Sequence, residues 1–256
     1  MTKEEWLNKR KFLLGPFIRL PRAEIVEIMA LAGFDFAIVD LEHGAMSPSE
    51  VYPMILAAEN KGIRLIARVP GLQESYIKWL LDLGIGGLQI PHIKTPGDAA
   101  MAVEYARFHP EGERGLCRYV RAAEFSNTTK ENYLSEANKK SVLILQIEGK
   151  EGADNIEEII NVRGFDILFI GPYDLSQSLG LTGQIWHEKV VSEIKRIIRI
   201  CSEKNISTGI FTDTPEGIER WSSLGVKYLN YRIDVEMMLN YSKTVVADIQ
   251  QILQNK

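Results

Sequence analysis

Residues 141–170, SVLILQIEGKEGADNIEEIINVRGFDILFI, hold two short apolar runs separated by a segment of helical period. The runs Ser141–Ile147 and Phe165–Ile170 are strand-sized and well short of the roughly 18 apolar residues that span a bilayer. Runs that are apolar throughout are typical of strands buried on both faces of a parallel sheet. This stretch therefore predicts a strand, a helix and a second, parallel strand.

The same unit recurs along the whole chain. Apolar runs rich in Ile, Val, Leu and Phe predict eight strands, at Leu13–Ile18, Phe36–Asp40, Leu65–Val69, Gly87–Ile90, Val142–Ile147, Ile167–Ile170, Ser207–Phe211 and Tyr228–Tyr231. Amphipathic segments predict helices at Ala23–Ala32, Pro48–Lys61, Glu74–Leu83, Pro96–Phe108, Asn155–Asn161, His187–Lys204, Pro215–Leu224 and Asp234–Gln254. Glycines that suit left-handed C-caps stand at Gly33, Gly62, Gly84, Gly164 and Gly225.

Eight strand and helix units in 256 residues predict an α/β fold, the (β/α)₈ TIM barrel. An open doubly wound sheet usually has fewer strands, and a GxGxxG turn is absent. No linker divides the chain, so we expect a single domain over residues 1–256. The long, charged segment His109–Lys140 breaks the rhythm and is expected to be a long βα-loop insertion, serving as a binding loop, a lid or a small added helix.

The composition excludes several classes of function. With 30 Lys and Arg against 34 Asp and Glu, a net charge of −4 and no basic block, the chain is not expected to bind nucleic acid or a membrane surface. Residues 1–11 lack the apolar run of a secretory signal, so we expect a cytoplasmic protein. Cys117 and Cys201 are far apart and are interpreted as structural.

Candidate functional residues follow the predicted strands, because the active sites of such barrels lie at the carboxyl ends of the strands. Four ends are polar: DLEHG at 40–44, RVP at 68–70, QIEG at 146–149 and GPYDLS at 171–176. In a closed barrel these four segments would surround one mouth.

Two carboxylates in this set, Glu148 and Asp174, follow neighbouring strands. Two oxygen ligands that leave positions for water and substrate suit a hard divalent ion such as Mg²⁺ or Mn²⁺. Alternatively, each carboxylate caps the helix that follows it. As a pair in a barrel mouth, they favour the metal interpretation.

Arg68, at the end of an apolar strand, would be a buried charge that requires a partner. Its planar guanidinium suits a substrate carboxylate, and the alternative is an ion pair with Glu42 or Asp40. His43 stands three residues after Asp40, so that carboxylate could orient its imidazole as a base near neutral pH. The alternative for His43 is a purely structural role.

An ordered set of motifs resembles a known family. AGFDFAIVDLEHG, RVP, LDLGIGGLQIPHI, HPEGERG, LQIEG and GPYDLSQSLG occur in this order over most of the chain. Together they resemble the metal-dependent class II pyruvate aldolases of the HpcH/HpaI type. The ordered set of motifs is highly specific for this family, whereas any single motif would be weak evidence.

The resemblance implies a (β/α)₈ barrel in which Glu148 and Asp174 bind Mg²⁺, Mn²⁺ or Co²⁺, with no organic cofactor. It further implies that Arg68 and Gln146 contact pyruvate, and that the backbone amides of Tyr173 and Asp174 close the site.

His43, paired with Asp40, would be the acid/base group. The implied reaction is the reversible cleavage of a 4-hydroxy-2-oxo acid to pyruvate and an aldehyde through a metal-stabilised pyruvate enolate. Family members are typically homo-oligomers, as hexamers built from three dimers. A Schiff-base mechanism is disfavoured because the predicted strands carry no lysine.

Two other functions remain open at this stage. A lyase like citrate lyase or malyl-CoA lyase would want a basic groove for a nucleotide, and no such cluster is evident. A non-catalytic barrel that binds a 2-oxo acid and a metal would not need His43. The sequence departs from the family pattern at residues 116–121, which are bulky and charged, and at Tyr173, where small residues are usual, so the choice of aldehyde stays undetermined.

Overall fold

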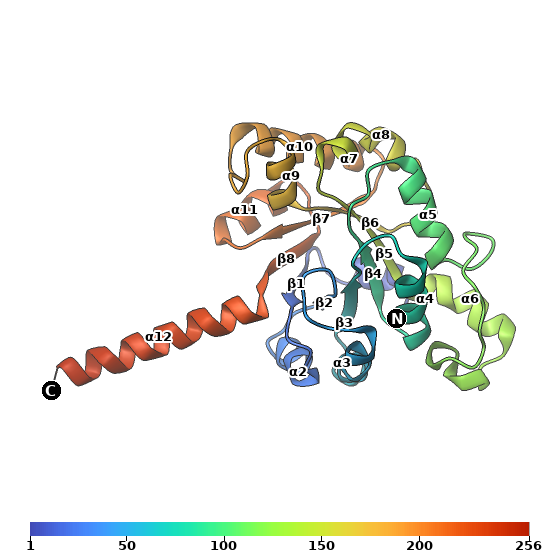
Figure 1. Ribbon diagram of the computed structural model, residues 1–256, viewed down its shortest axis with the longest axis horizontal. Coiled ribbons are helices and arrows are strands. Elements are labelled where there is room, and N and C mark those ends of the chain that lie inside the picture. Colours follow the sequence, from blue (N-terminus) through green and yellow to red (C-terminus); the bar gives the residue numbers. More distant parts are fainter. Residues whose placement is uncertain (256) are drawn as a thin grey trace.

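Eight strands close into a barrel in chain order, and each pairs in parallel with its neighbours, β8 with β1 included. The computed structural model describes residues 1–255 of this chain and is drawn in Figure 1. The strands are β1 (Leu13–Ile18), β2 (Phe36–Asp40), β3 (Arg64–Arg68), β4 (Gly87–Ile90), β5 (Val142–Ile147), β6 (Ile167–Ile170), β7 (Ser207–Thr212) and β8 (Tyr228–Ile233). The predicted (β/α)₈ barrel is confirmed.

Helices alternate with these strands, and most of them form the outer layer. They are α1 (Lys3–Leu7), α2 (Ala23–Leu31), α3 (Pro48–Lys61), α4 (Glu74–Leu83), α5 (Pro96–Ala106), η1 (Arg121–Ser126, a 3₁₀ segment), α6 (Lys130–Lys140), α7 (Lys150–Asp154), α8 (Ile156–Ile159), α9 (Pro172–Ser178), α10 (Glu188–Glu203), α11 (Pro215–Ser223) and α12 (Asp234–Gln254). The five glycines predicted as left-handed caps all have positive φ.

Alternation along the strands sorts side chains between the barrel interior and the helix layer. In β2, Phe36 and Ile38 join an inner cluster, whereas Ala37 and Val39 join the larger cluster beneath the helices. The period of two therefore directs Asp40, the last residue of β2, into the barrel at its carboxyl end. The same rule brings polar side chains from several strands into one layer there.

Aromatic side chains fill the opposite, amino-terminal end of the barrel. Phe36 and Tyr228, the first residues of β2 and β8, stack with their ring centroids 4.0 Å apart. Trp6 of α1 packs edge-on against both rings, at 6.1 and 6.2 Å. Gly15 is required beside them, because a Cβ at this position would lie 2.3 Å from the carbonyl oxygen of Phe36. This end of the barrel is therefore closed.

The segment 109–140 corrects one expectation. It follows α5 and leads into β5, so it is an αβ connection on the amino-terminal side of the barrel and not a βα loop at the mouth. Its last residue supports this placement, because the Lys140 carbonyl accepts a hydrogen bond from Arg64 at the start of β3. Of the three predicted forms, the added helix is present, as α6.

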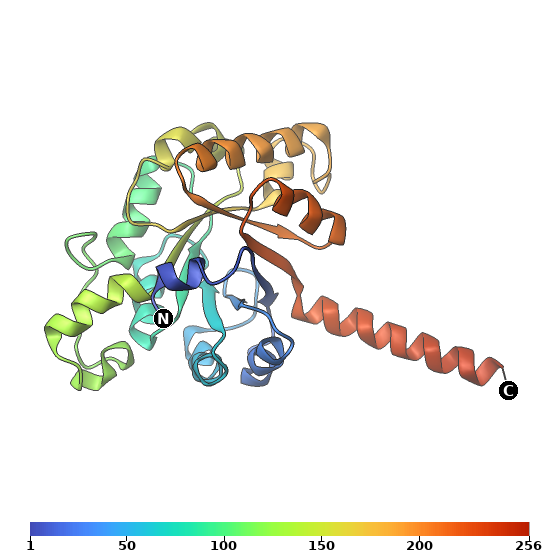
Figure 2. The ribbon, with the colours of Figure 1, turned by 180° about the vertical axis from the view of Figure 1, so that it is seen from behind.

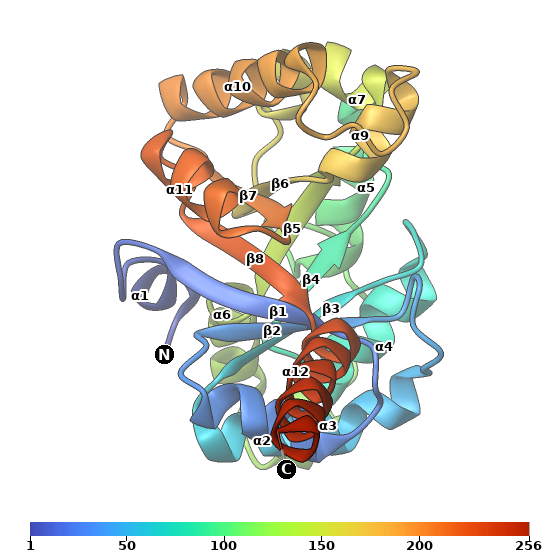
Figure 3. The ribbon, with the colours of Figure 1, turned by 90° about the vertical axis from the view of Figure 1, so that its left-hand side faces the viewer.

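The last helix, α12, projects away from the barrel instead of packing against it (Figures 1 and 2). Only its first residue, Asp234, is buried, and its carboxylate accepts hydrogen bonds from the backbone amides of Arg19 and Leu20. In Figure 3, which is turned by 90° from Figure 1, the same helix points toward the viewer. Among residues 1–255 no helix is both long and apolar enough to cross a membrane.

Candidate active site

Asp40 and Arg68 form a buried, doubly hydrogen-bonded ion pair at the mouth. They are directly opposite each other in the register of β2 and β3. Arg68 donates from Nε to Oδ1 of Asp40 at 2.9 Å and from Nη2 to Oδ2 at 2.7 Å. Burial alone would raise the pKa of Asp40, but the hydrogen bonds and charge of Arg68, together with the charge of Arg19, hold that pKa below its usual value.

Arg68 therefore realises one of the two predicted alternatives, the ion pair. Arg68 is 7% exposed, and its guanidinium lies over the ring of Phe17, 4.4 Å from the ring centroid. Burial would lower the pKa of Arg68, but Asp40, Glu42 and Glu148 raise it, so the arginine stays charged. Within residues 1–255, Nη1 of Arg68 makes no hydrogen bond, which leaves this NH₂ group for a ligand.

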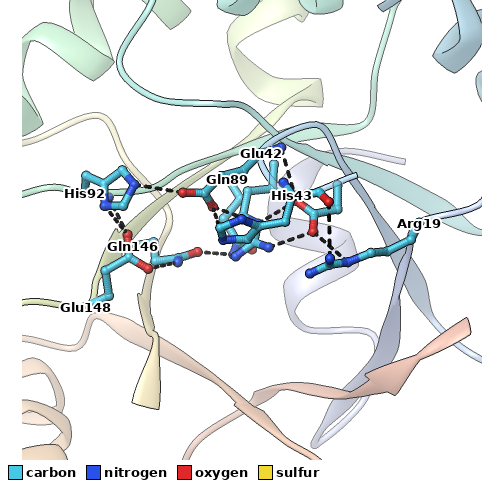
Figure 4. A network of polar contacts seen from close by, with 9 residues as sticks. Arg19, Glu42, His43, Gln89, His92, Gln146 and Glu148 are labelled. Atoms are coloured by element: carbon cyan, nitrogen blue, oxygen red, sulfur yellow. Dashed lines mark hydrogen bonds and ion pairs between the residues drawn. The ribbon is translucent and has the colours of Figure 1, made fainter. Parts of the chain in front are cut away.

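Glu42 and Glu148 lie on either side of His92, which follows β4 directly after Pro91. His92 is 2.8 Å from Oε1 of Glu42 through Nε2, and 2.7 Å from Oε1 of Glu148 through Nδ1 (Figure 4). The backbone amide of His92 also donates to Glu148. One ligand atom from each residue lies within 4.8 Å of the others, so the three form a candidate metal site.

A relay of amides positions Glu148 from behind. Gln89 donates to Gln146, and Gln146 donates to Oε2 of Glu148 (Figure 4). Burial raises the pKa of Glu148, against the effect of the hydrogen bond from Gln146 and of the nearby His92. Glu148 is thus a rigidly held carboxylate in a poorly hydrated position, which a cation would stabilise in its charged form.

Asp174 and Tyr173 occupy the first turn of α9, directly after Gly171. A Cβ at Gly171 would lie 3.1 Å from Oε2 of Glu148, so the start of α9 approaches that carboxylate closely. Asp174 is exposed, and among residues 1–255 no hydrogen bond engages its side chain. Its carboxylate is therefore free to act as a ligand, whereas helix capping was the alternative.

The side chain of His43 is 54% exposed. Asp40 reaches it through the backbone amide of His43, at 3.3 Å from Oδ1. The imidazole has a different neighbour, because its Nε2 lies 3.8 Å from Oε2 of Glu42. Asp40 therefore fixes the backbone of the DLEHG turn, and Glu42 is the carboxylate beside the ring.

One cavity of about 280 Å³ unites most of the predicted site residues. Five of them line it: His43, Arg68, Gln146, Tyr173 and Asp174. A larger cavity of about 800 Å³ lies beside η1 and α6, away from the mouth, and none of these five residues lines it. The chemistry of the lining residues, and not the volume, therefore identifies the site.

Sequence reasoning missed Arg19, Gln89 and the bridging position of His92. Arg19 follows β1 directly and pairs with Asp40 at 3.2 Å from Nε to Oδ2. A signal existed for Gln89, because it is the one polar residue of the buried run Gly87–Ile90. No local pattern indicates the bridging position of His92, which has a left-handed backbone with φ of 60°.

A buried arginine, an imidazole and two carboxylates line one cavity at the carboxyl ends of the strands, which is where (β/α)₈ enzymes have their active sites. The family model described as HpcH/HpaI aldolase/citrate lyase matches residues 13–238. This chain belongs to the HpcH/HpaI aldolase/citrate lyase family.

Individual relatives agree with this assignment. Hydroxypyruvate/pyruvate aldolase of Roseobacter denitrificans is 32% identical over 98% of this chain and 97% of its own. The 5-keto-4-deoxy-D-glucarate aldolase of Escherichia coli K12 is 31% identical over 87% of this chain and 86% of its own. The crystal structure of an HpcH/HpaI aldolase from Desulfitobacterium hafniense has a TM-score of 0.91 at 29% identity, covering 98% of this chain and 97% of that one.

These findings confirm the predicted family and the predicted class of enzyme, a class II aldolase that acts on carbon–carbon bonds. Aldolases of this class use a divalent metal ion. The residues at the mouth fit such an ion, because Glu148 supplies a buried carboxylate and both Asp174 and the pair of Glu42 and His92 offer further ligands.

Proposed function

We propose that this protein reversibly cleaves a 4-hydroxy-2-oxo acid to pyruvate and an aldehyde. The observation that carries the proposal is the single cavity lined by His43, Arg68, Gln146, Tyr173 and Asp174, with Asp40 and Glu148 held directly behind it. A bound divalent ion would polarise the 2-oxo group and stabilise the enolate. The relatives named hydroxypyruvate/pyruvate aldolase and 5-keto-4-deoxy-D-glucarate aldolase support this choice of substrate.

Each residue has a distinct part in this proposal. Arg68 binds the pyruvate carboxylate through its free Nη1, because Asp40 occupies Nε and Nη2 and locks the guanidinium plane. Gln146 and the backbone amides of Tyr173 and Asp174 bind the other oxygens of pyruvate, since all three residues line the cavity. His43 moves the proton of the aldol hydroxyl, because its exposed imidazole stands at the same cavity.

We assign the divalent ion, Mg²⁺, Mn²⁺ or Co²⁺, to Glu148 and Asp174, with no organic cofactor. Asp174 has a free carboxylate, and the close approach of Gly171 to Glu148 brings the start of α9 near that ligand. The competing set is Glu42, His92 and Glu148, whose ligand atoms already lie together. Both sets contain Glu148, so substitutions at Asp174 and His92 distinguish them.

We infer further that the protein is a homo-oligomer, with a hexamer of three dimers as its expected form. Apolar side chains on α12 repeat with helical spacing and stand exposed: Val235, Met238, Leu239, Val245, Val246, Ile249, Ile252 and Leu253. A helix with such a stripe gains stability only when another surface covers it. Since α12 leaves its own barrel, a second copy of this chain is the proposed cover.

The cytoplasm remains the proposed location. Cys117 and Cys201 are both free thiols, which suits a reducing compartment.

Exchange of the pyruvate methyl protons with D₂O tests the proposed function without knowledge of the aldehyde. Protein stripped of metal with EDTA is incubated with pyruvate, with and without added Mg²⁺ or Mn²⁺, and the methyl signal is followed by NMR after removal of paramagnetic ion. Exchange that requires both protein and metal supports enolisation at this site. Absence of exchange with every metal would contradict the proposal and favour a lyase that acts on CoA thioesters.

A further inference from the structure

The outer wall of the active-site cavity is built from the segments that follow β6 and β7. Tyr173 is the second residue of α9, and Asp213 comes directly after β7. The Tyr173 hydroxyl donates to Oδ2 of Asp213 at 2.6 Å, and both residues line the cavity. The ring of Tyr173 also packs against Phe211, with centroids 6.1 Å apart. Two independent contacts therefore fix this wall.

The Asp213 carboxylate retains unused hydrogen-bonding capacity. Tyr173 occupies only Oδ2, and in the described part of the chain Oδ1 accepts no hydrogen bond. Arg19, which lines the same cavity, pairs with Asp40 at 3.2 Å, and Arg232, whose charge also acts on Asp213, pairs with Glu236 at 3.1 Å. Within residues 1–255 Asp213 makes no ion pair of its own, and it presents a carboxylate with a free acceptor to the cavity.

Tyr173 remains a neutral donor to this carboxylate. Its hydroxyl donates to Oδ2 at 2.6 Å, so this oxygen is already engaged. A ligand can approach only the remaining oxygen, and it must bring its own hydrogen-bond donor.

We propose that Asp213, held by Tyr173, selects acceptor aldehydes that carry a hydroxyl group and rejects those that carry a carboxylate. The inference rests on the proposed function, in which Arg68 and Gln146 bind pyruvate deeper in the cavity. The wall of Tyr173 and Asp213 then faces the aldehyde. A hydroxyl group donates to Oδ1, whereas a carboxylate brings a second negative charge beside Asp213, and Arg19 and Arg68, the arginines of this cavity, already pair with Asp40.

Three small aldehydes separate these effects in the condensation direction. Glycolaldehyde and propionaldehyde have nearly the same shape, and differ by a hydroxyl in place of a methyl group. Glyoxylate carries a carboxylate at the same position. With pyruvate and metal, we expect kcat/KM of the wild-type enzyme to favour glycolaldehyde over propionaldehyde by about tenfold to a hundredfold. Glyoxylate should be the poorest acceptor.

Two substitutions locate the effect at Asp213. Asp213→Asn removes the charge at constant shape. It should raise the ratio of kcat/KM for glyoxylate to kcat/KM for glycolaldehyde by about tenfold. Asp213→Leu removes the acceptor and should abolish the preference for glycolaldehyde over propionaldehyde. Glu216→Gln, an equal change of charge at an exposed position three residues away, is the matched control and should leave both ratios unaltered. Tyr173→Phe removes the hydrogen bond that holds Asp213, so it should lower the ratio of kcat/KM for glycolaldehyde to kcat/KM for propionaldehyde.

The readouts distinguish failure of this inference from failure of the proposed function. Ratios between aldehydes are compared within one variant, and the pyruvate exchange rate of that variant reports whether its pyruvate half is intact. If wild type exchanges pyruvate protons but prefers glyoxylate, or if the Asp213→Asn ratios stay within twofold of wild type, the inference is wrong. If wild type shows no metal-dependent exchange at all, the proposed function itself fails.

Discussion

Arg68 on β3 donates hydrogen bonds to both carboxylate oxygens of Asp40 on the neighbouring β2, from Nε at 2.9 Å and from Nη2 at 2.7 Å. The pair is buried, and Arg19 adds a second cation at 3.2 Å from Oδ2. Because Asp40 also accepts from the amides of Glu42 and His43, the same carboxylate orders the turn that carries the proposed acid/base group. The ionised carboxylate of Asp40 therefore orients both the guanidinium of Arg68 and the turn that carries His43.

Acid should weaken the fold through this carboxylate. The folded-state pKa of Asp40 lies below its ordinary value, so the unfolded chain takes up the proton first as the pH falls. The contribution of Asp40 is fully present above about pH 4 and is lost at lower pH. In Asp40→Asn we expect a smaller acid dependence of the unfolding free energy, together with destabilisation of about 3–5 kcal/mol because Arg68 remains buried without a counter-ion.

Urea unfolding between neutral pH and about pH 3 measures both effects. Asp154→Asn, at an exposed position, is the control and should keep the wild-type dependence. Equal pH profiles for wild type and Asp40→Asn would show that another group accounts for the acid sensitivity.

Calorimetric titration with Mn²⁺ should identify the metal ligands. We expect Glu148→Gln and Asp174→Asn each to weaken binding by about a hundredfold or more, and to abolish pyruvate exchange, because each removes a charged ligand. His92→Asn should change the affinity by less than about tenfold. Glu151→Gln, which is exposed on α7, controls for loss of charge. Strong loss in His92→Asn with little loss in Asp174→Asn would assign the ion to Glu42, His92 and Glu148 instead.

His43→Ala should separate turnover from binding. Its imidazole is exposed at the cavity and lies 3.8 Å from Glu42 without touching Glu148, so its removal should leave Mn²⁺ affinity near wild type. We expect the rate of aldol cleavage to fall by about 10²–10⁴-fold, the usual contribution of a general acid or base. His187→Ala, at the start of α10 and outside the cavity lining, is the control. Cleavage at the wild-type rate by His43→Ala would remove the histidine from the mechanism.

Charge on the exposed stripe of α12 should break the assembly. Val246→Asp and Ile249→Asp place carboxylates on the apolar face, whereas Gln251→Asp places one on the opposite face. Light scattering after gel filtration should give a multiple of the chain mass for wild type and for Gln251→Asp, and a single chain mass for the double variant. A wild-type protein that runs as a single chain at micromolar concentration would rule out the proposed homo-oligomer.

Most strands could be predicted from the sequence because their apolar runs are continuous. β2, β4, β5 and β6 begin and end at the predicted residues. β3 starts one residue early, at Arg64, whose backbone pairs with Phe36 while its guanidinium reaches the carbonyls of Gly86 and Lys140. A charged residue at a strand start interrupts the hydrophobic pattern although its backbone still fits the ladder.

The site was less predictable, because side-chain contacts depend on register and on local backbone turns. Asp40 and Arg68 are opposite each other only in the observed pairing of β2 with β3. The bridge made by His92 requires a left-handed residue directly after Pro91, which no local pattern indicates. The helical period of residues 234–254 predicted α12 but contained no information on the direction in which it leaves the barrel.

The packed rings of Trp6, Phe36 and Tyr228 close the amino-terminal end of the barrel, so substrates and products enter and leave only at the carboxyl end. Gln146 at the floor is 2% exposed, whereas Tyr173 at the rim is 40% exposed. In the proposed function pyruvate binds at the floor and the aldehyde at the rim, so the aldehyde should leave first and pyruvate last. In cleavage, pyruvate should therefore inhibit competitively against the hydroxy-oxo acid and the aldehyde should inhibit non-competitively, so that pyruvate sets the resting state of the enzyme wherever it is abundant.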